Sequence, residues 1–364
     1  TLGSLLPSLI GRFGLDNAAA GSLFAVMSLG IMAGSIVFGP VVDRYGYKGL
    51  LTACITLILV GLEGLALAPT RALLVPAILL IGFGGGVVNG GTNALVADIS
   101  EEGKSARLAL VGVFFGIGAL GMPFVLGVLL DSVSYTTIVA FTGVPVACAA
   151  LYCALIRFPA PKQPQGFPLA QGVRLLRDPT LLLLGLMLFF ESGMEITAGG
   201  WMAAYVQESL ALPAERALFF ISLYWAGMTV ARLVLGRLLD RLDPAHVLVV
   251  SIGTALLAAL LLIAGRSVAT AAVGSTLLGA GFAGVFPIVL GFVGDRYVAL
   301  SGTAFSVVIV MALMGGTALP WLTGVLGDAV GLRASFALIP TALIAMGLVF
   351  TAVRRGIRVP APVR

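Results

Sequence analysis

The stretch "GPVVDRYGYKG", Gly39 to Gly49, joins two long apolar runs of the chain. Within it Asp43 and Arg44 stand side by side, Gly46 follows, and Lys48 comes two residues later. An apolar run of about 20 residues is long enough to cross a membrane as a helix. The stretch therefore predicts a short charged turn between two membrane spans.

The composition of the whole chain fits this interpretation. The 364 residues are 59% hydrophobic and 10% charged, and the mean hydropathy is +1.11. An ordinary soluble domain carries about 25% charged residues, so an integral membrane protein of the all-α class is predicted. A short stub precedes the apolar segments, which lie at residues 17–42, 49–68, 72–97, 105–130, 135–156, 179–207, 214–239, 246–264, 267–293, 299–327 and 333–353.

The charged turn recurs 197 residues later, where "GRLLDR" places Gly236, Asp240 and Arg241 opposite Gly39, Asp43 and Arg44. Other glycines, prolines and acids repeat with the same offset. A same-direction repeat predicts two pseudo-symmetric six-helix bundles related by an axis along the membrane normal. The expected divisions are an N-terminal bundle at 1–158, a linker at 159–178, a C-terminal bundle at 179–354 and a tail at 355–364.

The offset also predicts that the first of twelve helices is truncated, with residues 1–13 as its outer end. If both ends of the chain lie on one side, that side holds 15 of the 21 Lys and Arg residues. Positive charge is retained on the cytoplasmic side, so the linker and C-terminus are expected there. We expect a multi-pass protein of a bacterial inner membrane, embedded in lipid as a monomer.

The charged turn has a physical use beyond orientation. Asp43 can meet the positive N-terminal end of a helix near Gly302, while Arg44 and Lys48 can reach an acid such as Asp98. Such contacts would act as a conformational latch on the cytoplasmic side. The expected latch residues are Gly39, Asp43, Arg44, Gly46, Lys48, Asp98, Asp240 and Arg241. The alternative is a solvated loop whose bases only set orientation.

Two acids in "FFESGMEITAGGW", Phe189 to Trp201, lie inside an apolar span. Glu191 and Glu195 are four residues apart and share one helix face. Acids inside a membrane are costly and usually serve proton or substrate movement. We predict that Glu195, assisted by Glu191, is the proton-coupling site. The alternative is a structural cluster with Arg232 on the next helix, or an Arg232 that extends toward the cytoplasm instead.

Amide and aromatic side chains in the spans suit stacking and hydrogen bonding to a polyol, although aromatic residues in spans also serve packing and interface anchoring. The expected substrate-binding residues are Asn89, Asn93, Trp201, Tyr205, Tyr224, Trp225 and Trp321.

Several other activities find no support. "GIGALG", Gly116 to Gly121, lies in an apolar span without a preceding strand, so it does not predict dinucleotide binding. The sequence has no phosphate-binding loop, hydrolase motif or metal cluster, and its three cysteines are expected to be core residues. Neither an enzyme, a catalytic residue, a cofactor, a metal nor a nucleic-acid partner is expected. A membrane sensor or scaffold would need an output domain, which the pattern does not supply.

"GPVVDRYGYKG" resembles the signature loop of the major facilitator superfamily. "FFESGMEITAGGWMAAYV" and "SLYWAGMTVARLVLGRLLDR" are similar to the seventh and eighth helices of its fucose permease-like, sugar:proton symporter branch. The resemblance covers nearly the whole chain and implies a central site and alternating access. Glu195 matches the acid of the seventh-helix pattern, and Trp201 matches its tryptophan.

The chain departs from that branch in its fourth and fifth helices. Asn89 stands four residues before Asn93, where a carboxylate is common in the branch, and Ala109 and Gly112 replace polar residues. Glu191 is expected to take over the role of an acid lost from the first helix. The sequence thus predicts a secondary transporter of a small organic solute, such as a sugar or sugar derivative, driven by protons. The alternative within transport is an exporter or flippase of amphipathic metabolites, drugs or lipids.

Overall fold

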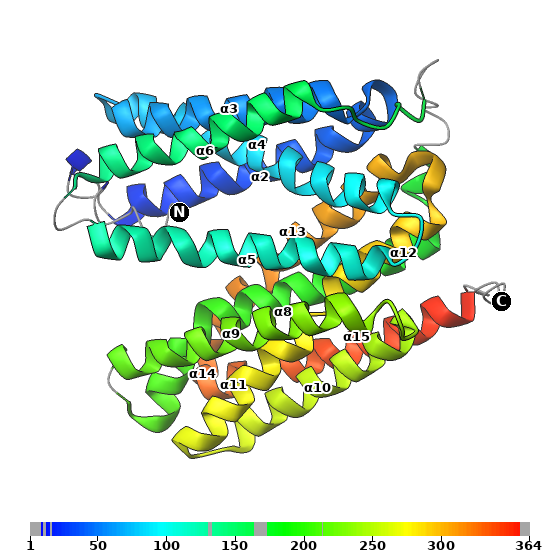
Figure 1. Ribbon diagram of the computed structural model, residues 1–364. Coiled ribbons are helices and arrows are strands. Elements are labelled where there is room, and N and C mark those ends of the chain that lie inside the picture. The colour runs from blue at the N-terminus through cyan, green and yellow to red at the C-terminus, as the bar shows by residue number, and fades with distance from the viewer. Residues whose placement is uncertain are drawn as a thin grey trace. The chain divides into compact units, whose positions relative to one another are not determined.

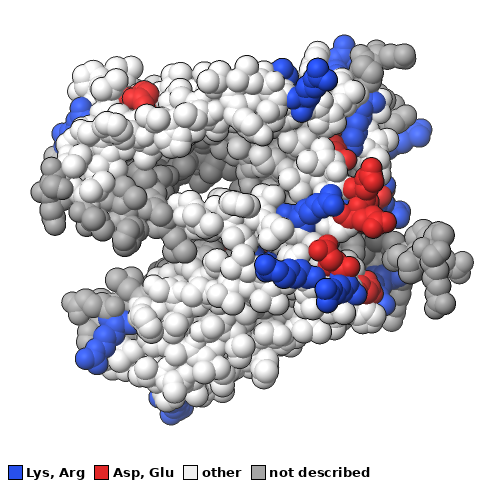
Figure 2. All heavy atoms as spheres, in the orientation of Figure 1, with Lys and Arg blue, Asp and Glu red and all other residues white. Residues whose placement is uncertain are grey.

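The structure is a computed structural model that describes residues 9, 12–14, 17–129, 133–163, 173–212 and 214–356. These residues form helices and connecting turns, as Figure 1 shows, so the predicted all-α class is confirmed. Figure 2 shows long surfaces without charge, with Lys, Arg, Asp and Glu gathered near the ends of helices. This distribution is the one expected of helices that cross a membrane.

Among the described residues, five long helices come before the linker: α2 (Asn17–Tyr45), α3 (Tyr47–Leu67), α4 (Arg71–Ile99), α5 (Lys104–Leu129) and α6 (Tyr135–Leu155). After it come α8 (Pro179–Leu210), α9 (Ala214–Leu238), α10 (Pro244–Ala264), α11 (Val268–Phe282), α12 (Val285–Arg296), the 3₁₀ turn η1 (Val298–Leu300), α13 (Ser301–Val330), α14 (Leu332–Ser335) and α15 (Leu338–Gly356).

The described residues contain ten spans that are long and apolar enough to cross a membrane, and α11 and α12 together form one of them, Val268–Arg296. They correspond to ten of the eleven expected segments, and the 26-residue α5 corresponds to the other. The expected stub of a first helix lies mostly outside the described residues.

Polar residues at the helix starts explain where several helices begin. The Asp178 side chain accepts hydrogen bonds from the backbone N–H groups of Thr180 and Leu181, and Pro179 opens α8. Ser267 and Thr270 form a reciprocal capping box at the start of α11. These side chains satisfy N–H groups that have no partner within the helix.

Two compact units make up the chain. Unit 1 contains residues 1–95, 114–172 and 298–306, and unit 2 contains residues 96–113, 173–297 and 307–364. Each unit therefore takes most of its helices from one half of the sequence. Unit 1 adds η1 and the start of α13, and unit 2 adds the end of α4 and the start of α5. The boundaries predicted from the repeat stay a prediction.

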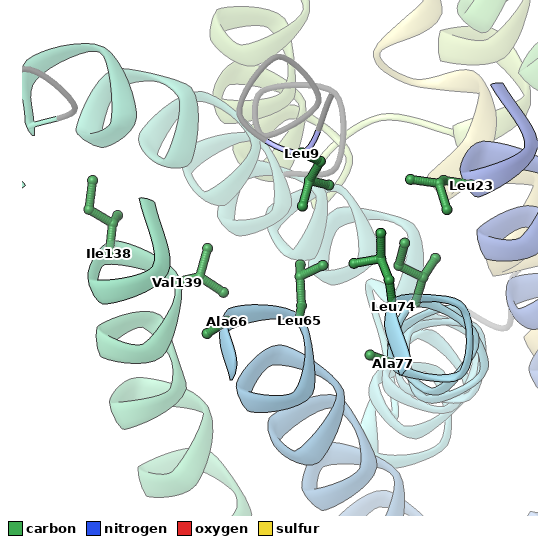
Figure 3. Close-up of a cluster of buried hydrophobic side chains, with 9 residues drawn as sticks. Leu9, Leu23, Leu65, Ala66, Leu74, Ala77, Ile138 and Val139 are labelled. Atoms are coloured by element: carbon green, nitrogen blue, oxygen red, sulfur yellow. The ribbon is translucent and has the colours of Figure 1, made fainter. Parts of the chain in front are cut away.

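Unit 1 has an apolar cluster at one end of its helices (Figure 3). Leu9, Leu23, Leu65, Leu74 and Val139 belong to it, and each is at most 2% exposed. Beside it, the Arg12 guanidinium donates to the carbonyl oxygens of Ala66 at 3.2 Å and Ala68 at 2.9 Å. This contact satisfies carbonyls at the C-terminal end of α3, where the helix itself supplies no donors.

In unit 2, α9 and α11 approach each other closely at two glycines. A Cβ atom on Gly279 would overlap the carbonyl oxygen of Tyr224, and one on Gly227 would overlap that of Thr276. Small residues of this kind allow membrane helices to pack backbone against backbone. The α9–α11 contact therefore fixes the position of Tyr224, which carries part of the site described below.

This close approach gives a stability prediction. Gly279→Ala should lower the free energy of unfolding by about 1–3 kcal/mol, because the methyl group has no space. The matched control is Gly253→Ala in α10, where no atom lies within 4 Å of an added Cβ. The control should leave stability unchanged or raise it by about 0.5–1 kcal/mol. Thermal unfolding of the purified protein in detergent measures both, and equal melting temperatures for the two variants would contradict the packing account.

Candidate functional site

The two acids of α8 occupy different environments. Glu191 is fully buried, and its Oε2 accepts a hydrogen bond from the Ser192 hydroxyl at 3.0 Å. Its other oxygen, Oε1, receives no hydrogen bond from any donor among the described residues. A buried oxygen without a donor is costly, so the Glu191 carboxyl is a position where an added proton would be stabilising.

Glu195 lies one helical turn further along α8 and remains partly accessible. Its side chain is 20% exposed, and its Oε2 lies 3.8 Å from Nη2 of Arg232 on α9. The Tyr224 hydroxyl donates to the Glu195 backbone carbonyl at 3.3 Å. The structure therefore brings the two predicted acids together with Arg232, the partner in the structural alternative, and with Tyr224, one of the predicted aromatic residues.

The Arg232 guanidinium is held loosely although its side chain is only 11% exposed. Its Nη1 donates to the Gly112 carbonyl at 3.5 Å, and its Nε has no partner among the described residues. In the same unit, Lys104 and Asp295 form an ion pair at 2.7 Å. A charge-assisted contact normally closes to about 2.7–2.9 Å, so the Glu195–Arg232 pair is open by comparison.

Gly112 of α5 lies next to the Arg232 guanidinium and contacts it through its backbone. A Cβ atom on Gly112 would lie 3.2–3.3 Å from the end of the Arg232 side chain, so the glycine makes room for the guanidinium and offers its carbonyl instead. The sequence interpretation treated Gly112 as a lost polar contact and missed this role. An isolated glycine within a span was the available signal, because such a residue often marks a close approach.

The predicted aromatic residues divide into two groups. Trp225 packs edge to face against Tyr224 at 5.2 Å, its ring faces Gly199 of α8, and Nε1 of Trp201 donates to the Pro320 carbonyl at 3.1 Å. These side chains lie on α8, which carries both acids, and on α9, which carries Arg232. Tyr205, by contrast, is buried, stacks on Phe336 at 3.9 Å and donates to the Leu262 carbonyl at 2.6 Å, which is the arrangement of a packing residue.

Three further predicted solute contacts are Trp321, Asn89 and Asn93. Trp321 is 68% exposed on α13. Asn89 and Asn93 lie on α4 in unit 1, where the Asn93 amide donates to the Asn89 carbonyl at 2.8 Å. The Asn93 side chain is buried and that of Asn89 is exposed. The amides therefore form a local pair on α4.

Asp43, at the end of α2, binds the start of α13 within unit 1. Its Oδ1 accepts from the Gly302 backbone N–H at 3.1 Å, and its Oδ2 accepts from the Thr303 N–H at 2.8 Å and hydroxyl at 2.6 Å. The side chain is buried, and a Cβ on Gly39 would lie 2.5 Å from the Gly302 carbonyl oxygen. Gly39 thus allows α13 to approach, and Asp43 binds the first N–H groups of α13, as the sequence predicted.

The other members of the predicted latch are less enclosed. The Arg44 guanidinium lies over the Tyr45 ring at 5.2 Å, while Lys48, Asp240 and Arg241 are exposed. Asp98 is partly buried near the end of α4. A Cβ on Gly103, just before α5, would lie 2.8 Å from Oδ1 of Asp240, so the second acid also lies beside the start of a helix.

A family comparison covers the helices, the charged turn and the two acids of α8 described above. The Major Facilitator Superfamily profile matches residues 1–297 and 184–364, which together cover the chain. The chain belongs to the major facilitator superfamily. It is therefore a multi-pass membrane transporter with the major facilitator fold, and not an enzyme.

Relatives within the superfamily are distant but extensive. The transporter y4wD of Sinorhizobium fredii is 24% identical over 338 residues, which cover 92% of this chain and 89% of the relative. The glucose/mannose transporter GlcP of Bacillus subtilis is 23% identical over 341 residues, covering 88% of this chain and 82% of GlcP.

Among solved structures, the fucose:proton symporter FucP of E. coli is similar in fold. One structure of FucP, in its outward conformation, superposes with a TM-score of 0.84 at 21% sequence identity. The superposition covers 98% of this chain and 94% of FucP. At this identity the likeness shows the fold alone. Any proposal about the substrate must therefore be argued from the residues of the site.

Proposed function

We propose that the protein is a proton-coupled secondary transporter of a small hydroxylated solute, such as a sugar or sugar derivative, in a bacterial inner membrane. The linker and C-terminus would lie on the cytoplasmic side. The observation that carries the proposal is the pair of carboxyl groups on α8 that face one loosely held guanidinium. The names of GlcP and FucP, which refer to sugars, support the solute class.

The charges of the cluster explain how protons would drive transport. With both acids ionised, Glu191, Glu195 and Arg232 together carry one net negative charge. One added proton makes the cluster neutral, and it can satisfy the Glu191 oxygen that has no donor. A neutral cluster costs less to enclose in a dry site than a charged one, so protonation would favour closure around the solute.

The partly exposed Glu195 is the member of the pair best placed to exchange its proton. Its contact with Arg232 is long, so protonation gives up little attraction, and Arg232 can compensate through the Gly112 carbonyl. A close bidentate pair would instead hold the acid ionised and make it structural. The open geometry therefore supports coupling over the purely structural alternative.

The aromatic residues beside the acids would bind the solute. Trp225 and Trp201 lie on the same two helices as the cluster, and the faces of aromatic rings bind sugars together with polar groups. We propose these two as the primary solute contacts. A solute contact of Asn89 and Asn93 on α4 stays a prediction from the sequence. Tyr224 would act mainly by positioning α8 through its bond to the Glu195 carbonyl.

The coupling proposal predicts a separation of two activities. In proteoliposomes, Glu195→Gln should abolish uptake driven by a pH gradient but largely preserve exchange of solute across the membrane, because the neutral amide mimics the protonated state. The assay solute is the compound that most raises the melting temperature in a screen of sugars, nucleosides, amino acids and amphiphiles. If an amphiphile raises the melting temperature most, the protein is better described as an exporter of amphipathic compounds than as a sugar transporter.

The matched control is Glu63→Gln, which alters an acid of α3 in unit 1. This variant should keep its response to the pH gradient. A Glu195→Gln protein that still accumulates solute in response to the gradient, or that is unfolded while Glu63→Gln is not, would show that Glu195 is not the coupling residue.

The Asp43 contact predicts an effect on the conformational equilibrium. Asp43→Asn removes the negative charge from the start of α13, which should cost about 0.3–2 kcal/mol of the contact and shift the population toward the inward-open state. The exposed Glu101→Gln is the control and should have no effect.

Distances between spin labels measure this shift. Labels at Gly49 in α3 and His246 in α10 place one probe in each unit, in a variant whose native cysteines are replaced. Gly49 suits a label because an added Cβ there has no neighbour within 4 Å. Identical distance distributions for Asp43→Asn and the parent protein would refute the latch.

A further inference from the structure

The start of the interdomain linker is bound to both sides of the Asp43 contact. After α6 the chain continues to Gln163, whose backbone N–H donates to the Asp43 carbonyl at 2.8 Å. The Gln163 side-chain amide donates to the Ala299 carbonyl at 3.2 Å. One residue of the linker therefore bonds to the end of α2 and to the turn η1 just before α13.

Lys162 strengthens the attachment to η1 and α13. Its ammonium group donates to the Val298 carbonyl at 2.7 Å and to the Ser301 hydroxyl at 2.6 Å. The same ammonium lies close enough to Asp43 for their charges to attract. Hydrogen bonds from a charged donor are about twice as strong as neutral ones, so the Lys162 contacts are stronger than that of the neighbouring Gln163 side chain.

Pro161 completes the contact on the side of α2. Its ring lies 3.6 Å from the place that a Cβ on Gly46 would occupy, which is ordinary van der Waals distance. Gly46 itself has φ of 80°, a left-handed conformation that favours glycine and turns the chain between α2 and α3. Pro159 and Pro161 restrict the backbone that delivers Lys162 and Gln163, because each proline fixes its own φ.

We propose that linker residues Pro161, Lys162 and Gln163 are a third component of the latch, and that Lys162 and Gln163 are positioning residues for the conformational step of transport. They hold η1 and the start of α13 against the end of α2, so the Asp43 contact opens only when the linker detaches. The inference rests on the proposed alternating-access function. On this proposal the linker does more than connect the two halves of the chain. It influences the rate of the conformational change and the ratio of the two conformations.

A purely structural role for Lys162, as a cap on loose carbonyl groups, predicts something different. A cap would affect the melting temperature alone, and its removal would combine additively with Asp43→Asn, since independent sites add. A latch component would change the balance of conformations and would show coupling to Asp43.

The experiment is a double-mutant cycle with Lys162→Met and Asp43→Asn, read by the same Gly49 and His246 spin labels. Lys162→Met should shift the ratio of the two populations on the order of tenfold toward the inward-open state. The double variant should shift the ratio by clearly less than the product of the two single shifts. Lys162→Arg, which keeps the charge and its donors, should restore most of the parent distribution.

Two further variants keep the test decisive. Arg174→Met removes an exposed base later in the linker and should leave the distribution unchanged. Gln163→Pro removes the N–H that binds Asp43, and it gives a second route to detachment if Lys162→Met fails to fold. Unchanged distributions for Lys162→Met and Gln163→Pro, or shifts that multiply independently with Asp43→Asn, would overturn the proposal. Loss of pH-driven uptake in Glu195→Gln bears only on the transport function, so the two can fail separately.

Discussion

The free-energy cost of burying a charged side chain is the constraint on which the rest of the structure depends. Only 10% of the residues are charged. Each buried ionic group needs donors or acceptors from another element, because water is scarce and desolvation is expensive. Asp43 is buried and obtains three donors from the start of α13. The mostly buried Lys104 side chain pairs at 2.7 Å with Asp295, which is exposed. Helices distant in sequence are tied together at these few points, while apolar contacts elsewhere along their length are far less specific.

The α8 acids are the exception, and they carry the proposed function. Glu191 keeps an oxygen without a donor among the described residues, and Arg232 keeps an unpaired Nε. Two incompletely satisfied partners at one place retain a capacity for change, because a proton or a ligand can improve the contacts. Asp43 offers no such capacity, since both its oxygens are already bound. The Asp43 contact is therefore suited to stabilising one conformation of the transporter. The α8 acids are suited to responding to a proton or a ligand.

The sequence predicted the helices, the shared face of Glu191 and Glu195, and the Asp43–Gly302 contact. The proximity of Arg232 to Glu195 belonged to its structural alternative. These features depend on the length of apolar runs, the spacing of residues along a helix and the positions of charges, all of which the sequence shows directly. It did not predict the role of Gly112, the burial of Tyr205 or the attachment of Lys162 and Gln163. A membrane helix is apolar toward lipid and toward its neighbours alike, so the pattern does not reveal which face is internal. The linker contacts depend on the fold of elements far apart in sequence.

The helix α13 has a mechanical property that follows from its place in the chain. Its first residues belong to unit 1 and the rest to unit 2, over 30 residues in one continuous helix. At 1.5 Å per residue, Pro320 lies about 28 Å from the start, so each degree of tilt there displaces it by about 0.5 Å. One continuous helix therefore carries both the N–H groups that bind Asp43, at its start in unit 1, and the Pro320 carbonyl that accepts from Trp201 in unit 2.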